Sequence, residues 1–492
     1  MKKIFCIALL ALSFCATVSA QHNLRTGYFL DGYIYKHKLN PALASDRGYF
    51  AIPIAGYVSA GVESTLPAST FLAADANGKM MTFINPNVNA EDVLSGISAN
   101  ANYPMNLNLD VPVISFGFHA GKSFNTLDLS LKSDVRSTVP GSMFYWAKQQ
   151  YGSSMNMSDF ALNSNTRLEL SYGYSRQCGE KFRFGFKLKF LAGLVKADYT
   201  MENLTMGVEN DVWSIAAKGS GYYASSGVGL KTNDAGIITG FDAPKNASAI
   251  FNSVKNTKNY GGAVDLGISW DILSWITLSA SVTDLGVLNW NNVSTLESVE
   301  RTMDYTGFAG LGEGAKEGVG SELKSFGSGL LDVMSPKVVG TEDKMLDKLS
   351  ATAHAGLEIR VPFYKRLSVG ALATHRFDGA YSWKELRGSV NWALFRWLSF
   401  SASHAWSFYG DTKLQSFGGA INFHPNGLNI FVGVDSYKTV MNTFKLPALN
   451  LPGENFNNTT LAVGVNFAFG KYHGRFPRKS QVAKVETEVQ EN

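Results

Sequence analysis

Residues Lys181 to Leu191 read Lys-Phe-Arg-Phe-Gly-Phe-Lys-Leu-Lys-Phe-Leu. Successive side chains of an extended strand point to opposite faces, so the phenylalanines and Leu188 share one face, while the cations and Gly185 share the other. A soluble sheet would need a second apolar layer to cover the first face. Because similar alternation recurs along the chain, a wall with lipid outside and water or polar side chains inside explains it better. The stretch predicts a strand of a transmembrane β-barrel.

The composition supports a chain built from many strands. Charged residues make up only 17% of the 492 residues and aromatic residues 12%, and there are 48 glycines. Glycine and aromatic enrichment without helical periodicity suits strands joined by turns. The formal net charge of +4 is small for this length and does not indicate nucleic-acid binding.

Residues 1–20 have the pattern of a secretory signal peptide. A basic start precedes an apolar run too short to span a membrane, and residues 18–20 are the small residues of a cleavage site. We expect cleavage before Gln21; a lipoprotein signal at Cys15 fits less well because a bulky phenylalanine precedes it. The mature chain then keeps one cysteine, Cys178, and forms no internal disulfide. An exported chain without a later membrane helix is periplasmic, secreted or an outer-membrane barrel.

Between residues 48 and 470 the alternation predicts an all-β fold, an antiparallel up-and-down barrel of about fourteen strands. Short connections such as 177–180 and 425–427 alternate with long ones, as short periplasmic turns and longer external loops do in outer-membrane barrels. An even number of strands puts both termini in the periplasm. The expected strands cover residues 49–62, 106–119, 126–136, 167–174, 181–191, 260–270, 276–282, 351–360, 367–377, 385–394, 398–408, 413–423, 428–437 and 459–470.

The long connections contain further predicted elements. Asn89 followed by two acidic residues predicts a helix start, and another short helix is expected near 143–150. Residues 200–258 are polar and predict a loop with a small hairpin, and 291–349 a third long insert. The charged residues 471–492 are expected to form a disordered periplasmic tail. Aromatic side chains flank the short turns, as in an interfacial girdle: Trp270, Trp275, Phe363, Tyr364, Phe395 and Trp397.

The second expected strand changes its outward parity near Pro112. Val113 continues the apolar parity of Leu107, Leu109 and Val111, whereas Ile114 begins the apolar parity of Phe116 and Phe118. Two consecutive residues are therefore expected to point outward. Proline cannot donate to a sheet ladder, and the switch predicts a β-bulge or kink at Pro112, Val113 and Ile114.

Charged side chains on the inward parity give the predicted lumen a mixed charge. Eight strands enclose an interior that side chains fill, whereas sixteen to eighteen leave an aqueous channel. A barrel of about fourteen strands should therefore hold a plug, a narrow channel or a ligand. The inward charges either neutralise one another across the lumen, which we favour, or form a substrate site. They are Asp128, Lys132, Asp134, Arg183, Lys187, Lys189, Glu358 and Arg360.

The sequence contains no convincing motif for catalysis or metal binding. The glycine-rich run 310–314 mimics a phosphate loop but lacks the flanking strand and helix and carries an acid. No two histidines have the i, i+4 spacing of a helical metal site. A lipase would need Ser and His brought together by the fold, which the sequence leaves open. We expect no enzyme, no catalytic residue, no cofactor and no metal.

In its architecture the chain resembles the FadL-like outer-membrane transporters of hydrophobic compounds and their PorV-like relatives. The resemblance rests on the signal peptide, on Asn40-Pro41-Ala42 before the first strand, and on the number of strands; Leu43 stands where that family usually has glycine. It implies that residues 21–47 fold into the barrel (48–470) as a hatch. It also implies that a strand kink, for which the Pro112 bulge is the candidate, opens a side exit into the membrane. We hypothesise that the hatch, which bears Asn40, supplies the hydrogen bonds that the bulge leaves unpaired; the alternative is that the bulge only adds twist and curvature.

Three functions remain open. The first is a passive channel for hydrophobic or amphipathic small molecules with a hatch-gated lateral exit. The second is a PorV-like scaffold or shuttle subunit of an export or envelope machine, and the third is a general diffusion porin. The expected partners are outer-membrane lipid, a hydrophobic small-molecule ligand and other envelope or exported proteins, with no nucleic acid.

Overall fold

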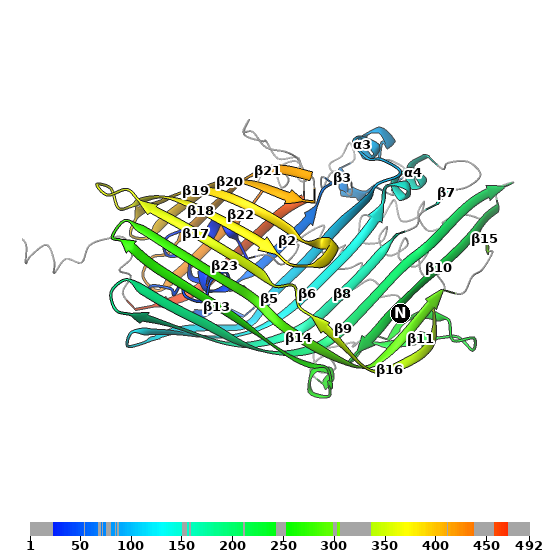
Figure 1. Ribbon diagram of the computed structural model, residues 1–492, viewed down its shortest axis with the longest axis horizontal. Helices are drawn as coiled ribbons and strands as arrows, with labels where there is room; N and C mark the ends of the chain where they lie inside the picture. The colour runs from blue at the N-terminus through cyan, green and yellow to red at the C-terminus, as the bar shows by residue number, and fades with distance from the viewer. Residues whose placement is uncertain are drawn as a thin grey trace, which may run out of the picture.

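The computed structural model describes residues 23–53, 55–66, 70, 72–74, 80–83, 85, 88–149, 155–156, 159–209, 212–242, 252–298, 303–305, 336–410, 412–436 and 457–470. Within them, one antiparallel sheet of 19 strands closes on itself. Closure occurs where the last strand pairs with the first two. The long, tilted strands of the barrel are seen in Figure 1.

The first part of the barrel wall contains its longest strands. It comprises β1 (Gly48–Ala51), β2 (Val58–Ser64), β5 (Asn102–Ala120), β6 (Ser123–Pro140), β8 (Ala161–Cys178), β9 (Phe182–Glu209), β10 (Val212–Ser225), β13 (Tyr260–Leu273) and β14 (Ile276–Ser298). Two short additions are β7 (Met155–Asn156) and β15 (Met303–Tyr305).

The second part is shorter and more regular. It comprises β16 (Pro336–Lys348), β17 (Thr352–Arg360), β18 (Leu367–Arg376), β19 (Trp383–Phe395), β20 (Leu398–Tyr409), β21 (Thr412–Phe423), β22 (Leu428–Val434) and β23 (Asn457–Phe469). Small separate sheets pair β3 (Leu72–Ala74) with β4 (Met80–Thr82), and β11 (Gly229–Thr232) with β12 (Ile238–Asp242).

The ring has fourteen strand positions, as predicted. β1 and β2 occupy one position, because both pair with β5 and β23. β9 pairs with β13 over its first part and with β10 over its second, so β10 continues the position of β13. In the same way β14 pairs with β17 and then with β16. The expected all-β barrel is confirmed.

The side chains follow the parity predicted for 181–191. Leu188 and Phe190 are 56% and 52% exposed on the outer face, whereas Lys187 and Lys189 are 4% and 7% exposed. Trp270 and Trp275, beside the short β13–β14 turn, are also exposed. An apolar outer face around a closed ladder leaves no unpaired edge in lipid, which is how strands cross outer membranes.

The predictions for 200–258 and 291–349 were partly wrong, because both ranges contain long strands. β9 continues to Glu209 and β10 returns beside it, while β14 continues to Ser298 and pairs with β16. These extensions rise beyond the rest of the ring, at the right in Figure 1. A strand outside the lipid needs no apolar outer face, so the alternation that marks a membrane strand is missing there.

The predicted short helices and hairpin in the long connections are present. Asn89 accepts a hydrogen bond from the backbone of Glu91 and begins α3 (Ala90–Leu94). The second short helix is α4 (Gly141–Gln149), and β11–β12 is the expected hairpin. The signal peptide, the run 310–314 and the tail 471–492 lie outside the described residues. None of the described helices is long and apolar enough to cross a membrane.

The first expected strand, 49–62, is interrupted rather than continuous. β1 ends at Ala51 and β2 begins at Val58, and the described residues between them belong to no strand. The strand expected at 428–437 is β22, which ends at Val434. The candidate site lies at the interruption between β1 and β2.

Candidate functional site in the plugged lumen

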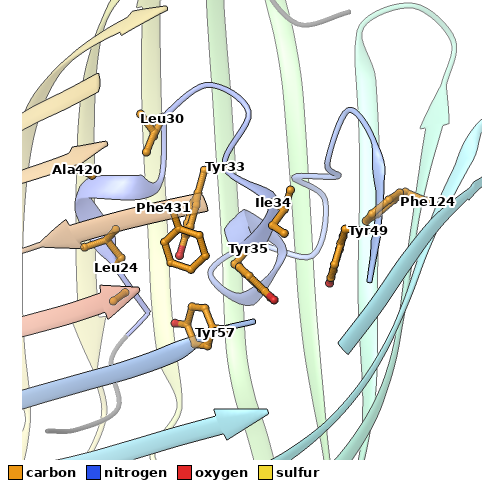
Figure 2. Packing of buried hydrophobic residues seen from close by; sticks show 11 residues of the cluster. Leu24, Leu30, Tyr33, Ile34, Tyr35, Tyr49, Tyr57, Phe124, Ala420 and Phe431 are labelled. Atoms are coloured by element: carbon orange, nitrogen blue, oxygen red, sulfur yellow. The ribbon is translucent and has the colours of Figure 1, made fainter. Parts of the chain in front are cut away.

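Residues 23–47, named the plug hereafter, lie inside the barrel and are almost entirely buried. The plug contains two short 3-10 helices, η1 (Arg25–Gly27) and η2 (Ile34–Lys38). Its apolar side chains form a common core with wall residues from strands far apart in the sequence (Figure 2). That core contains Leu24, Leu30, Tyr33, Ile34, Tyr35, Tyr49, Tyr57, Phe124, Ala420, Phe431 and Ala462.

The Asn40-Pro41-Ala42 motif packs against a glycine pair in the wall. Gly185 on β9 and Gly267 on β13 are register partners. A Cβ atom at Gly185 would lie 2.3 Å from the carbonyl carbon of Pro41, and one at Gly267 would lie 2.1 Å from Asn40 Oδ1. These two glycines therefore let the plug backbone approach the wall closely.

Asn40 is held at β13 and β14 and does not reach the Pro112 bulge. Its amide nitrogen donates to the carbonyls of Ile268 and Ala280 at 3.2 and 3.3 Å, and its Oδ1 accepts from the backbone N–H of Ala42 at 2.9 Å. Leu43 packs on the cluster of Tyr28, Phe29, Leu39 and Leu372. The suggestion that Asn40 supplies hydrogen bonds at the bulge is thus wrong, because its amide nitrogen donates to carbonyls of β13 and β14.

Charged groups fix the beginning of the plug. The backbone N–H and hydroxyl of Thr26 donate to Asp435 at 2.8 and 2.6 Å. Arg25 lies 3.1 Å from Glu385 and 3.5 Å from Asp435, and all three side chains are at most 2% exposed. Arg387 completes this buried cluster, with Nε 2.9 Å from Glu385.

The end of the plug is fixed by Arg47. Its guanidinium donates to the carbonyls of His424, Pro425 and Leu428 at 2.8 to 3.3 Å. These carbonyls belong to the short turn between β21 and β22 and to the first residue of β22. The plug is therefore tied to the wall at both ends by charged groups.

The barrel wall is broken between the first ring strand and β5. β2 pairs with β5 as far as Asp110, and β1 resumes pairing only at Phe116. On the other side of β5, the register with β6 shifts between Pro112 and Ile114, which leaves Val113 as the extra residue of a bulge. Val113 and Ile114 are both exposed on the outer face, at 39% and 44%.

Tyrosines of the plug and wall lie directly behind this break. The Tyr35 hydroxyl is 3.1 Å from the carbonyl oxygen of Gly56, inside the interruption, and 2.7 Å from Asn466 Oδ1. The rings of Tyr35 and Tyr57 have centroids 4.6 Å apart. Figure 2 shows both rings between the plug and the strands around it. Sequence reasoning missed these residues; the only signal was the density of aromatics between residues 28 and 35.

The predicted lumen charges are buried or half-buried on the inner wall. Most pair with groups on nearby strands, and Asp134 of β6 also lies 3.9 Å from Arg376 of β18, on a distant part of the ring. Seven of the eight form ion pairs, and Arg183 donates to Ser175 at 3.2 Å. The pairs are Lys187–Asp128 (3.0 Å), Lys189–Asp265 (2.7 Å), Lys132–Glu169 (3.0 Å), Asp134–Arg167 (2.5 Å) and Glu358–Arg360 (3.4 Å). A role for them in substrate binding stays a prediction.

A polar cavity of about 60 Å³ borders the plug. Its lining includes Asn23 and Arg25 of the plug, Arg167 of β8 and Arg376 of β18. The volume holds a few water molecules or a small polar group. Among the described residues, no group of three or more His, Cys, Asp or Glu side chains is placed to hold a metal ion.

Burial lowers the pKa of two histidines, one in the plug and one beside it. His37 belongs to η2, and burial together with the nearby Lys187 ammonium lowers its pKa to about 3. His424 lies in the β21–β22 turn, where its ring packs against Gly32, and burial lowers its pKa to about 4. Both imidazoles are therefore neutral near pH 7.

The sequence matches a known family over residues 41–435, described as a family of unknown function (DUF5723). No curated protein matches it. Similar solved structures include a Pseudomonas aeruginosa FadL homologue, with 12% identity, 92% of this chain and 98% of that chain covered, and a TM-score of 0.39. The Ralstonia pickettii toluene transporter TbuX has 9% identity, 92% and 97% coverage, and a TM-score of 0.43. Likeness at this level does not extend the substrates of those proteins to this chain.

Proposed function

The chain belongs to the DUF5723 family of unknown function, and we propose that it is a passive outer-membrane channel for hydrophobic or amphipathic small molecules. In this proposal the plug is the hatch, the short turns and both termini face the periplasm, and the substrate leaves sideways into the membrane. The exit is the wall break between the first ring strand and β5.

One observation carries the proposal: the break coincides with the bulge and is covered from inside by aromatic side chains. Unpaired ladder groups are costly in lipid unless protein or water satisfies them. Here the Tyr35 hydroxyl reaches the carbonyl of Gly56 within the break. A small movement of η2 would withdraw this cover and leave an aperture flanked by Val113 and Ile114, whose apolar side chains face the lipid.

The lumen offers two environments to an amphipathic substrate. The cavity beside Arg25, Arg167 and Arg376 is polar, whereas the core behind the break is aromatic. These two environments suit a molecule with a polar end and an apolar body. The buried plug disfavours a general diffusion porin, whose lumen would be open and wet.

A scaffold role for exported or envelope proteins is the second candidate. It is favoured by the sheet of β9, β10, β14 and β16, which extends past the membrane-spanning ladder. Long elements beyond a rigid barrel are suited to bind partners. If this role is correct, shortening these strands removes bound protein and leaves small-molecule uptake intact.

The test of the channel is to repair the wall. Pro112→Val combined with deletion of Val113 restores the alternation of β5 and supplies a ladder donor. We expect a folded barrel that no longer delivers an apolar fluorescent probe into the membrane of reconstituted vesicles. The matched control, Val113→Leu, keeps the extra residue and should deliver it normally. Normal delivery by the repaired, folded variant would overturn the proposed exit.

A further inference from the structure

Five buried side chains form a closed ring of hydrogen bonds between the plug and the wall. Lys187 Nζ donates to Asp128 Oδ2 at 3.0 Å and contacts His37 Nδ1 at 3.3 Å. His37 Nε2 lies 2.9 Å from the Tyr49 hydroxyl, which lies 3.1 Å from the Ser115 hydroxyl. Ser115 donates to Asp128 Oδ1 at 2.5 Å, which closes the ring.

Only one arrangement of protons satisfies every contact in this ring. An ammonium only donates, so His37 Nδ1 must accept from Lys187, and Nε2 must carry the proton. Nε2–H then donates to Tyr49, Tyr49 donates to Ser115, and Ser115 donates to the carboxylate of Asp128. The ring therefore holds His37 as one tautomer of the neutral imidazole.

The charges around His37 oppose a second proton on its ring. Lys187 of β9 faces Nδ1, and Lys38, the next residue of the plug, pairs with Asp110 of β5 at 2.6 Å. Asp128 of β6 is the one carboxylate in the ring, and Lys187 and Ser115 already occupy it. A proton on His37 Nδ1 would remove the acceptor of Lys187 and place two cations 3.3 Å apart in a buried site.

The ring also lies at the wall break. Tyr49 belongs to β1, close before the interruption, and Ser115 belongs to β5 directly after the bulge. His37 shares η2 with Tyr35, whose hydroxyl covers Gly56. A change at His37 therefore acts on the segment that closes the break.

We propose that the ring is a proton-sensitive latch: η2 remains against the wall while His37 is neutral, and protonation of His37 in acid releases η2 from the break. The latch concerns the movement of η2 alone, so it is testable whether or not a substrate passes. That the released η2 opens an exit rests on the proposed function.

The expected change of the open-to-closed ratio of η2 with pH follows from the linkage between protonation and opening. The closed form excludes the proton, whereas an open form that exposes His37 takes it up with the ordinary histidine pKa of about 6.5. The open-to-closed ratio should then rise about tenfold for each pH unit below that value, and about 30-fold between pH 7.5 and pH 5. The depressed pKa of His37 in the closed form, about 3, leaves this whole interval available.

Hydrogen exchange of the full-length protein in lipid vesicles measures this ratio. The protection factor of the η2 amides, with the intrinsic pH dependence of exchange divided out, reports local opening. We expect protection of η2 to fall about 30-fold from pH 7.5 to pH 5, while protection of β18–β20 stays constant. In His37→Gln, an amide that accepts and donates without titrating replaces the imidazole, and protection should be the same at both pH values.

The controls separate His37 from the other histidines. His375→Gln changes a half-buried outer-face ring on β18, and His424→Gln changes a buried histidine that lies against Gly32 of the plug. Both variants should keep the wild-type fall. If His37→Gln fails to fold, Lys187→Gln, which keeps a donor and removes the charge at Nδ1, should show a smaller fall than the wild type. Constant protection in the wild type, or a fall that persists in folded His37→Gln or is abolished by His424→Gln, would overturn the latch.

Discussion

Two regions of the barrel wall satisfy their backbone hydrogen-bonding groups in different ways. From β17 to β19 the ladder runs without a register shift. Between the first ring strand and β5 the ladder stops at Asp110 and resumes at Phe116. In the regular region the backbone satisfies itself, whereas at the break the plug supplies a partner. At the break, the wall is therefore completed by a segment that is not one of its strands.

The largest expected effect is on the anchor that holds the plug against the regular wall. Arg25→Met leaves the buried carboxylates of Glu385 and Asp435 with one cation fewer. Removing one partner of a buried ion pair costs about 3–5 kcal/mol. We expect this loss in urea unfolding in lipid vesicles, together with loss of exchange protection across η1.

The matched control is an exposed pair on the extended strands. Lys218 lies 3.1 Å from Glu202, with 75% and 52% of the side chains exposed. Lys218→Met should cost at most about 1 kcal/mol. Equal costs for Arg25→Met and Lys218→Met would mean that the plug anchor is not effectively buried.

The second prediction compares the lipid faces of the two regions directly. Leu188 on β9 and Val113 on β5 lie at similar distances from their short turns, and both are exposed outward. Leu188→Arg should cost about 2–4 kcal/mol, as arginine does near the bilayer midplane. Val113→Arg should cost less, because at the break the guanidinium can reach backbone carbonyls that no ladder partner uses. Unfolding in vesicles measures both costs. The same cost at both positions would argue against free backbone carbonyls within reach of residue 113 at the break.

The sequence predicted the ring well because lipid imposes the alternation. The strand at 181–191 has the expected parity, and the bulge beside Pro112 was readable because two outward residues, Val113 and Ile114, follow each other in the chain. The extensions of β9 and β14 were not predicted, because no lipid faces them and their outer residues are free to be polar.

The contacts of the plug could not be read from the sequence in the same way. Asn40 was identified by resemblance, but its partners, the carbonyls of Ile268 and Ala280, are backbone groups more than 200 positions away. Tyr35 and His37 lie within 3-10 helix, which has no alternation to mark an inner face. Which plug residue meets which strand depends on the path of the whole plug, and no local pattern encodes that path.

A third, smaller effect isolates the contact that covers the break. Tyr35→Phe keeps the aromatic packing on Tyr57 and removes the hydroxyl that lies near Gly56 O and Asn466 Oδ1. Leaving buried polar partners unsatisfied costs about 1–3 kcal/mol. We expect η2 to lose exchange protection by a corresponding factor, while global unfolding changes less. Unchanged protection of η2 would mean that the Tyr35 hydroxyl does not close the break.

The smallest effect concerns pH at the turn that anchors the end of the plug. His424 is neutral in the folded protein because burial lowers its pKa to about 4, whereas in the unfolded chain it titrates near 6.5. Its contribution to stability is complete above pH 6.5 and is lost as the pH falls towards 4, because the unfolded state binds the proton first. At pH 5.5 the loss should be about 1 kcal/mol. The difference in unfolding free energy between the wild type and His424→Gln, measured at pH 7.5 and 5.5, isolates this contribution from that of His37. If the two proteins lose the same stability over this interval, the ring of His424 is already accessible to protons in the folded barrel, and the β21–β22 turn is more open than its packing against Gly32 indicates.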